Sequence, residues 1–231
     1  MISLKEVRAE PLQKSVFIQS EGDQWFDRNQ AALAEPSVLR DSLVTRIARH
    51  LPEAAGTAWQ VLEIGCGQGG NLNALSRARS IKGRGIDPSA RAVAAGTSDF
   101  PHLELCVGTA DALPYAEASQ DMVWFGFCLY LVDRGLLQRV VAEADRVLRD
   151  GGMLVMVDFD PLTPCKRPYH HKNGLYSYKM DYSHLFLANP AYSLLEKYAT
   201  SHTKDGWAAD PQERIALNVC RKNINLAYQL V

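Results

Sequence analysis

A glycine-rich turn flanked by carboxylates is the part of this sequence whose residue types and spacing are best suited to chemistry. Residues 61–72 read VLEIGCGQGGNL, an apolar run that leads into four glycines and then into a helical pattern. Glycine adopts dihedral angles that a side chain forbids, and it lets the backbone approach a ligand closely. Asp87 stands 20 residues after Gly67, at the end of the next predicted strand. This spacing is typical of a site for a nucleotide or a nucleoside derivative.

The carboxylate of Glu63 distinguishes between two ligands that such a turn can hold. Gly65, Gly67 and Gly70 satisfy the G-x-G-x-x-G spacing of a dinucleotide site, so the glycines alone do not choose the ligand. A carboxylate two residues before the turn opposes a pyrophosphate and attracts a cation. S-adenosylmethionine carries a sulfonium and an ammonium group and no phosphate, so Glu63 favours it over NAD(P). An NAD(P)-dependent oxidoreductase is the alternative, weakened by the absence of a Y-x-x-x-K motif.

Residues 161–190 concentrate titratable side chains in a stretch without a clear period. This stretch contains four prolines, five aromatic residues and three histidines. Long irregular segments are uncommon in compact domains unless they form a lid or a binding loop, so we expect a lid over the active site. Histidine is the natural base near neutral pH. We expect His170 or His171 to act as a general base, with Tyr182 and His184 behind them. The alternative is a solvated polar loop whose tyrosines cover the core.

The charges of this insertion predict the character of the acceptor. Its basic residues outnumber Asp181 and are Lys166, Arg167, Lys172 and Lys179. A local positive patch suits an anionic acceptor, such as a phosphorylated, carboxylated or nucleotide-linked small molecule. The histidines do not predict a metal site, because adjacent histidines seldom converge on one ion.

Alternating apolar runs and helical patterns must position these residues. Helices are predicted over residues 36–51 and 136–148, the second ended by a glycine stop at residues 150–152. Strands are predicted at residues 60–66, 82–87, 103–107, 122–127 and 153–159, and a hairpin at 192–199 and 214–221. Several runs are apolar at consecutive positions, as buried parallel strands are. The predicted fold is α/β, a doubly wound, mostly parallel seven-stranded sheet with an antiparallel C-terminal hairpin and the lid insertion.

Length and composition indicate one ordinary globular domain. The 231 residues are 47% hydrophobic and 22% charged, with a formal net charge of -1, which argues against binding to nucleic acid through bulk electrostatics. Five cysteines without a C-x-x-C pair indicate neither a zinc cage nor a disulfide scaffold. The first residues lack the pattern of a signal sequence, and the longest apolar stretch is too short to span a bilayer. We expect a cytoplasmic protein, a monomer or homodimer, with no nucleic-acid or membrane partner.

Taken together, these motifs resemble the class I S-adenosylmethionine-dependent methyltransferases over roughly residues 61–221. The first motif of that family is an acidic residue followed by G-x-G-x-G. The matching residues are Glu63, Gly65, Gly67 and Gly69. Residues 108–115, GTADALPY, are similar to the family's G-D-A-x-x-L-P-F, with Thr109 in place of one polar residue.

The resemblance implies that the cofactor is S-adenosylmethionine, with S-adenosylhomocysteine as product. It implies that Asp87 takes the ribose hydroxyls and that Asp111 binds the adenine edge. Alternatives are that Asp87 caps the helix that follows it and that Asp111 forms an Asx turn. The expected cofactor-binding residues are Glu63, Gly65, Cys66, Gly67, Gly69, Asp87, Pro88, Asp111, Ala112, Phe125, Trp25 and Arg28.

The resemblance also implies that residues 1–35 are an extension that covers the cofactor, ahead of a methyltransferase domain over residues 36–231. In this extension we expect Trp25 or Phe26 to cover the cofactor and Arg28 to meet its carboxylate through a forked pair. The alternative is a capped helix that uses both aromatic side chains as core.

The expected function is methyl transfer to a small, anionic or sugar-like acceptor, with O- or N-methylation favoured. The stretches S-E-G-D-x-W-F-x-R-N and S-Y-K-M-D-Y-S resemble bacterial methyltransferases of surface-sugar and secondary-metabolite pathways. A methyltransferase fold retained as a non-catalytic binding subunit is the third alternative.

Overall fold

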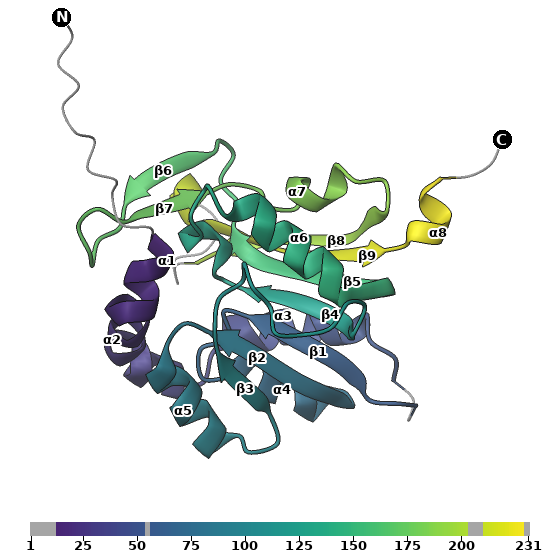
Figure 1. Cartoon of the computed structure of the whole chain (residues 1–231), viewed down its shortest axis with the longest axis horizontal. Coiled ribbons are helices and arrows are strands. Elements are labelled where there is room, and N and C mark those ends of the chain that lie inside the picture. The colour runs from purple at the N-terminus through teal and green to yellow at the C-terminus, as the bar shows by residue number, and fades with distance from the viewer. Residues whose placement is uncertain (1–12, 54–55, 203–209, 229–231) are drawn as a thin grey trace, which may run out of the picture.

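The computed structural model describes residues 13–53, 56–202 and 210–228, and it places helices on both faces of one large sheet (Figure 1). The strands are β1 (Trp59–Ile64), β2 (Ile81–Asp87), β3 (Glu104–Val107), β4 (Gln120–Gly126), β5 (Leu148–Phe159), β8 (Tyr192–Ser201) and β9 (Arg214–Lys222). Their order is β3-β2-β1-β4-β5-β9-β8, with β1 to β5 parallel and β9 antiparallel to both of its neighbours. The predicted mostly parallel seven-stranded sheet with an antiparallel C-terminal hairpin is confirmed.

The helices fall into an N-terminal group, three crossover helices and several short turns. The N-terminal group is α1 (Gln13–Val16), the π-helical turn η1 (Phe17–Glu21), α2 (Gly22–Ala34) and α3 (Val38–Arg49). The crossovers are α4 (Gly70–Ala78), α5 (Ala90–Asp99) and α6 (Leu137–Val147). The short turns are η2 (Leu129–Leu131), α7 (His184–Leu187), η3 (Pro211–Glu213) and α8 (Ile224–Ala227).

Strand β4 shows how the sheet divides the core into two layers. Its residues from Met122 to Phe125 are all buried, as a strand covered on both faces requires. Val123 and Phe125 pack with α6 and α7, whereas Met122 and Trp124 pack with α3 and α4. Because successive side chains of a strand point to opposite faces, one consecutive apolar run supplies both layers.

The predicted helix stop at residues 150–152 is wrong. Helix α6 ends at Val147, and β5 begins at once, because Leu148 already pairs with Gln120 of β4. Residues 150–152 therefore belong to the first part of β5, where Gly151 has a φ of 70°.

The insertion is more regular than its sequence suggests. It contains a second, two-stranded antiparallel sheet, which is formed by β6 (Cys165–Pro168) and β7 (Tyr176–Lys179) and lies beside α1 in Figure 1. The Tyr176 backbone N–H donates to the Gln13 side chain at 2.7 Å, so the insertion is bonded to the N-terminal segment.

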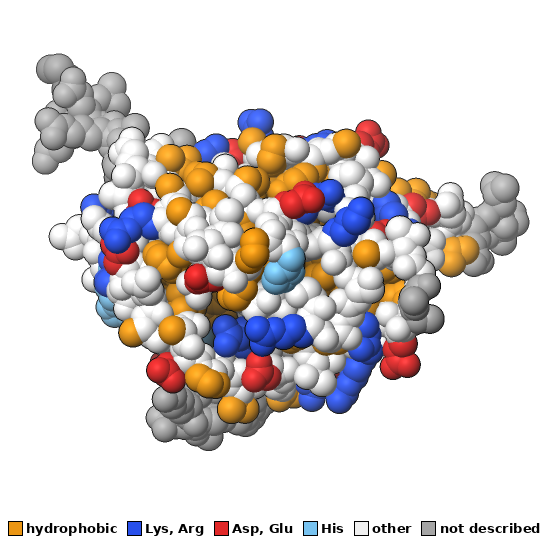
Figure 2. Space-filling model, turned by 90° about the horizontal axis from the view of Figure 1, so that it is seen from below, with side chains coloured by type: hydrophobic (Ala, Val, Ile, Leu, Met, Phe, Trp, Pro, Cys, Tyr) orange, Lys and Arg blue, Asp and Glu red, His pale blue; other side chains and the backbone are white. Residues whose placement is uncertain are grey.

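The surface shows no large field of one sign on the face drawn in Figure 2, where acidic and basic side chains are interspersed. Within the described part of the chain, the helices are too short or too polar to cross a membrane.

Gly96 lets α5 pack closely against the glycine turn, so a side chain at this position should destabilise the fold. A Cβ at Gly96 would lie 2.3 Å from the backbone oxygen of Gln68. At an exposed helix position, replacing Gly with Ala raises the free energy of unfolding by about 1 kcal/mol, because Ala has the higher helix propensity. Here we expect Gly96→Ala to lower the free energy of unfolding in urea by roughly 1–3 kcal/mol, as overpacking does. Ala94→Gly, at an exposed position of the same helix, is the control for propensity alone. A gain in stability for Gly96→Ala would contradict the contact.

Candidate functional site

A cavity of about 550 Å³ lies where the carboxyl ends of the parallel strands meet the N-terminal helices. The turn after β1 and the first residues after β2 and β4 line it from the sheet, as expected for an open α/β fold. Lys14, Phe17 and Trp25 line it from the N-terminal segment.

The glycine turn forms the floor of the cavity with left-handed backbone. Gly65, Gly67 and Gly69 have φ values of 76°, 53° and 83°, which side chains rarely tolerate. A Cβ on Gly65 would lie 2.6 Å from the Cβ of Cys128, so a side chain has no room there. A Cβ on Gly67 would meet no protein atom within 4 Å, so at this position the backbone conformation alone demands glycine.

Asp87 holds this turn in place from the end of β2. One carboxylate oxygen accepts the backbone N–H of Gly67 at 2.9 Å, and the other accepts that of Ser89 at 2.9 Å. Burial raises the pKa of Asp87, although both of these hydrogen bonds oppose the shift. The alternative role predicted for Asp87 is to cap the following helix. Ser89 is the residue that caps α5, because its side chain accepts a hydrogen bond from the Ala92 N–H.

Glu63 is fully buried immediately behind the cavity wall. Its Oε1 accepts a hydrogen bond of 2.7 Å from Asn71, which lines the cavity, whereas its Oε2 has no partner. A Cβ on Gly126 would lie 2.3 Å from Oε1, so glycine at this wall position makes room for the carboxylate. Burial raises the pKa of Glu63 to about 8. A nearby cation would stabilise the ionised form of this buried carboxyl group.

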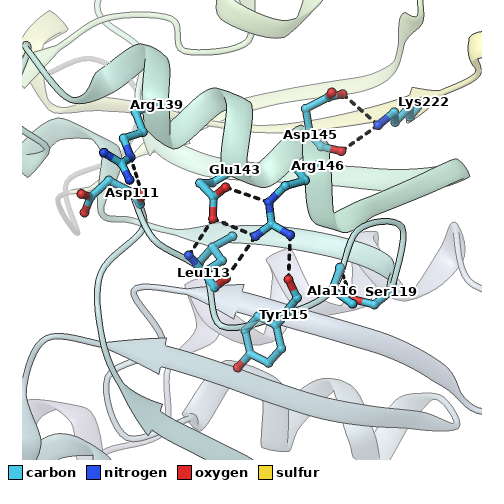
Figure 3. A network of polar contacts seen from close by, with 10 residues as sticks. All are labelled: Asp111, Leu113, Tyr115, Ala116, Ser119, Arg139, Glu143, Asp145, Arg146 and Lys222. Carbon is cyan, nitrogen blue, oxygen red and sulfur yellow. Dashed lines mark hydrogen bonds and ion pairs between the residues drawn. The ribbon is translucent and has the colours of Figure 1, made fainter.

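Asp111 reaches the cavity from a loop that α6 positions. Arg139 donates to its backbone carbonyl at 2.9 Å, and Glu143 accepts the Leu113 N–H at 2.8 Å (Figure 3). The Asp111 carboxylate accepts from the Lys14 ammonium at 2.6 Å. Burial opposes ionisation of Asp111, but the hydrogen bonds from Lys14 and Thr109 and the charge of Lys14 together outweigh it and lower the pKa. Lys14 was not among the predicted site residues, because no local motif surrounds it.

The structure brings seven of the twelve expected cofactor-binding residues to the cavity lining. These are Gly65, Cys66, Gly67, Asp87, Pro88, Asp111 and Trp25.

The other five lie elsewhere, each for a packing reason. Glu63 stands behind the wall, and Gly69 packs against Leu103 and Leu105. Phe125 is buried in the core, and Ala112 is exposed. Arg28 binds the buried Glu21 and lies 3.4 Å from the Tyr169 hydroxyl, so it is not directed at a cofactor.

The four residues expected to supply a base do not line the cavity, so their role as a base stays a prediction. His170 and His171 are exposed in the β6–β7 connection. His184 is 76% exposed and lies 3.4 Å from Asp181. Tyr182 is buried and donates its hydroxyl to the Tyr178 carbonyl. Pairing of β6 with β7 leaves His170 and His171 in an exposed connection, whereas Tyr182 packs in the core and His184 begins α7.

The positive charge of the insertion is largely matched by carboxylates. Lys179 lies 2.8 Å from Glu213, and Arg167 lies 3.6 Å from both Asp210 and Glu213. Lys166 lies over the Tyr176 ring. The expected basic patch for an anionic acceptor therefore loses most of its support. Within the described ranges, His, Cys, Asp and Glu nowhere form a group of three that could hold a metal.

His202 lines the cavity, although in the sequence it lies in the connection of the predicted hairpin without a motif around it. Strand β8 runs parallel to β5 because β9 lies antiparallel between them. Its carboxyl end therefore reaches the same sheet edge as the end of β5. Strand direction was the signal that could have found this residue.

The raised pKa of Glu63 predicts how stability depends on pH. The folded protein holds a proton on Glu63 from its ordinary value of 4.5 up to about 8, whereas the unfolded chain releases it. The native state binds more protons in this window, so stability falls as the pH rises through it. We expect Glu63→Gln to gain stability relative to the wild type between about pH 5 and 8, by a few kcal/mol. Urea denaturation across this range tests it, with the exposed Glu53→Gln as control. A difference between Glu63→Gln and wild type that does not change with pH would contradict it.

Comparison with known proteins identifies the domain. Residues 61–152 match the family model of the methyltransferase domain. A curated relative, 27-O-demethylrifamycin SV methyltransferase of Amycolatopsis mediterranei (strain S699), is 35% identical over 146 residues, covering 58% of this chain and 49% of its own. The chain thus spans about half the length of this relative.

Solved structures share the fold over most of the chain. 1,6-Didemethyltoxoflavin-N1-methyltransferase of Burkholderia thailandensis, solved with S-adenosylhomocysteine bound, has a TM-score of 0.69 at 14% identity and covers 90% of this chain and 88% of its own. The cyclase SpnF has a TM-score of 0.65 at 19% identity and covers 94% of this chain and 98% of its own. Residues 61–152 therefore form a methyltransferase domain, and the sheet order and the overall fold match those of Rossmann-like methyltransferase structures.

Proposed function

We propose that the protein transfers the methyl group of S-adenosylmethionine to a small acceptor that enters the same cavity. The observation that carries this proposal is the pair of buried carboxyl groups at the glycine turn, Asp87 and Glu63. Asp87 accepts the Gly67 N–H of the turn. Glu63 is hydrogen-bonded to Asn71 of the cavity lining, and its Oε2 has no hydrogen-bond partner.

These residues fit a ligand that is cationic and free of phosphate. A buried carboxyl group without a partner on Oε2 is stabilised by a nearby positive charge and destabilised by a pyrophosphate. In the family pattern Asp87 takes the ribose hydroxyls, and its two oxygens retain acceptor capacity beyond one N–H each. Asp111 stands at the family's adenine position, with Lys14 holding its carboxylate.

The chain's contribution to the reaction is alignment and exclusion of water. Bound S-adenosylmethionine supplies a methyl group that its sulfonium already activates for displacement. Trp25, Phe17 and Asn29 line the cavity from the N-terminal helices and cover the turn. Enclosure of this kind holds the donor and the acceptor in one geometry and removes competing water.

The acceptor is proposed to be a small molecule with an apolar, planar part. Phe17, Phe127 and Tyr130 give the cavity aromatic walls. A sugar-like or anionic acceptor has less support, because the insertion's cations are matched by Asp210 and Glu213. O- or N-methylation remains part of the proposal. The names of the relatives include an O-, an N1- and a ubiquinone/menaquinone C-methyltransferase, so they do not select the atom.

Calorimetry tests the cofactor. We expect the wild-type protein to bind S-adenosylhomocysteine in the micromolar range and to give no heat with NAD. Asp87→Ala should weaken S-adenosylhomocysteine binding about 10- to 100-fold, because hydrogen bonds to a charged group are lost and the turn loosens. Asp99→Ala, at the exposed end of α5, should bind as the wild type does. Binding of NAD in place of S-adenosylhomocysteine would refute the proposal.

A further inference from the structure

An aromatic cluster at the cavity wall packs against one side of His202, whose side chain is 50% exposed. The Phe127 and Tyr130 rings follow β4 and pack at a centroid distance of 5.4 Å. The imidazole of His202 stacks on Phe127 at 5.1 Å with an interplanar angle of 15°. All three residues line the cavity, so one wall combines flat apolar surface with a titratable ring.

Glu213 anchors His202 from the start of β9. The backbone N–H of His202 donates to the Glu213 carbonyl at 2.9 Å, and the Glu213 carboxylate lies 3.6 Å from the imidazole Nδ1. The other oxygen of that carboxylate lies 2.8 Å from Lys179 and 3.6 Å from Arg167. The Glu213 carboxylate thus lies between two cations and the Nδ1 edge of the imidazole, an arrangement that favours the proton on Nδ1. The nitrogen on the opposite edge of the ring, Nε2, then carries the lone pair.

The surroundings of His202 keep its ring neutral near pH 7. Burial beside Phe127 and Phe159 lowers the pKa of His202, Glu213 opposes the shift, and Lys179 adds to it. Among the described residues, Glu213 and Lys179 are the charged groups that act on the ring, and Arg167 contacts Glu213.

We propose, on the basis of the proposed function, that His202 is the base for the acceptor, that Glu213 is its positioning residue, and that the acceptor carries an aromatic hydroxyl group. Its ring would lie against Phe127 and Tyr130, and its hydroxyl would donate to Nε2.

The chemistry of imidazole selects a phenol over an aliphatic alcohol. A phenol has a pKa of about 10 and an imidazole of about 6.5, so the proton moves uphill by a few units. An aliphatic alcohol resembles water, with a pKa near 15.7, which is far beyond the reach of this base.

The step balances without another reactant. The phenolic proton passes to Nε2 of His202, and an oxygen lone pair forms the new O–CH₃ bond. The C–S bond of the sulfonium breaks, and its electron pair stays on sulfur, which leaves neutral S-adenosylhomocysteine. The imidazolium then releases its proton to solvent.

The carboxylates that line the cavity in its described part are already engaged. Asp133 accepts the backbone N–H groups of Gln13 and Lys14, and Asp111 is paired with Lys14. Asp87 holds the glycine turn. His202 is the histidine of this lining.

A graded series of phenols tests the inference with radiolabelled S-adenosylmethionine. We expect the wild-type protein to methylate 4-methoxyphenol and 4-nitrophenol. His202→Phe keeps a ring against Phe127 but has no basic nitrogen. It should lower kcat for 4-methoxyphenol about 10²–10⁴-fold, the usual contribution of a general base, with little change in KM. The loss should be much smaller for 4-nitrophenol, which is largely ionised above neutral pH.

Further variants separate positioning from folding. Glu213→Gln should lower kcat with KM unchanged and move the acidic limb of the kcat–pH profile to lower pH. His202→Phe should abolish that limb. The exposed His102→Asn is the matched control and should behave as the wild type does. S-adenosylhomocysteine affinity, measured by calorimetry on each variant, reports intact folding, and His202→Gln replaces His202→Phe if the latter does not bind.

Two results would overturn the inference while the proposed function stands. One is a His202→Phe enzyme with wild-type kcat for 4-methoxyphenol and an unchanged acidic limb. The other is a wild-type protein that binds S-adenosylhomocysteine but methylates neither phenol. Failure of the wild-type protein to bind S-adenosylhomocysteine would instead overturn the proposed function itself.

Discussion

The hydrogen bond from the Gly67 N–H to the Asp87 carboxylate is the constraint on which the site depends. It joins the turn after β1 to the end of β2 at 2.9 Å and fixes a backbone whose φ values suit glycine alone. A second carboxylate, Glu63, lies behind the same turn with one oxygen unpartnered. Ionised Glu63 beside Asp87 is costly in the free protein, so burial raises the pKa of Glu63 to about 8. A ligand with positive charge offsets that cost, so the site and its cofactor are electrostatically complementary.

The rest of the cavity is assembled from segments that are distant in the sequence. Helix α6 orders the Asp111 loop through Arg139, Glu143 and Arg146, and each of these contacts ends on a backbone atom of that loop (Figure 3). The N-terminal segment brings Lys14 to the Asp111 carboxylate. Asp111 is therefore held at the cavity from two sides, by α6 through its loop backbone and by Lys14 through its carboxylate.

The hairpin at the end of the chain completes the wall. Strand β8 ends at the same sheet edge as β5, where Thr200, Ile215 and Phe159 lie side by side across three strands. His202 and Glu213 therefore meet just beyond this edge, next to Phe127. The insertion contributes by its cations, because Lys179 and Arg167 hold Glu213 rather than an acceptor.

The sheet, the glycine turn and the acids at the ends of β1 and β2 can be predicted from the sequence. They follow from local signals: runs of consecutive apolar residues, closely spaced glycines after such a run, and acidic residues at strand ends. Tertiary structure alone decided which titratable side chains reach the cavity. His170, His171 and His184 are clustered in the sequence yet do not line the cavity, because the first two lie exposed in the β6–β7 connection and His184 begins α7 with its side chain 76% exposed. His202 and Lys14 have no motif around them and line it, because strand direction and helix packing bring separate segments to one edge.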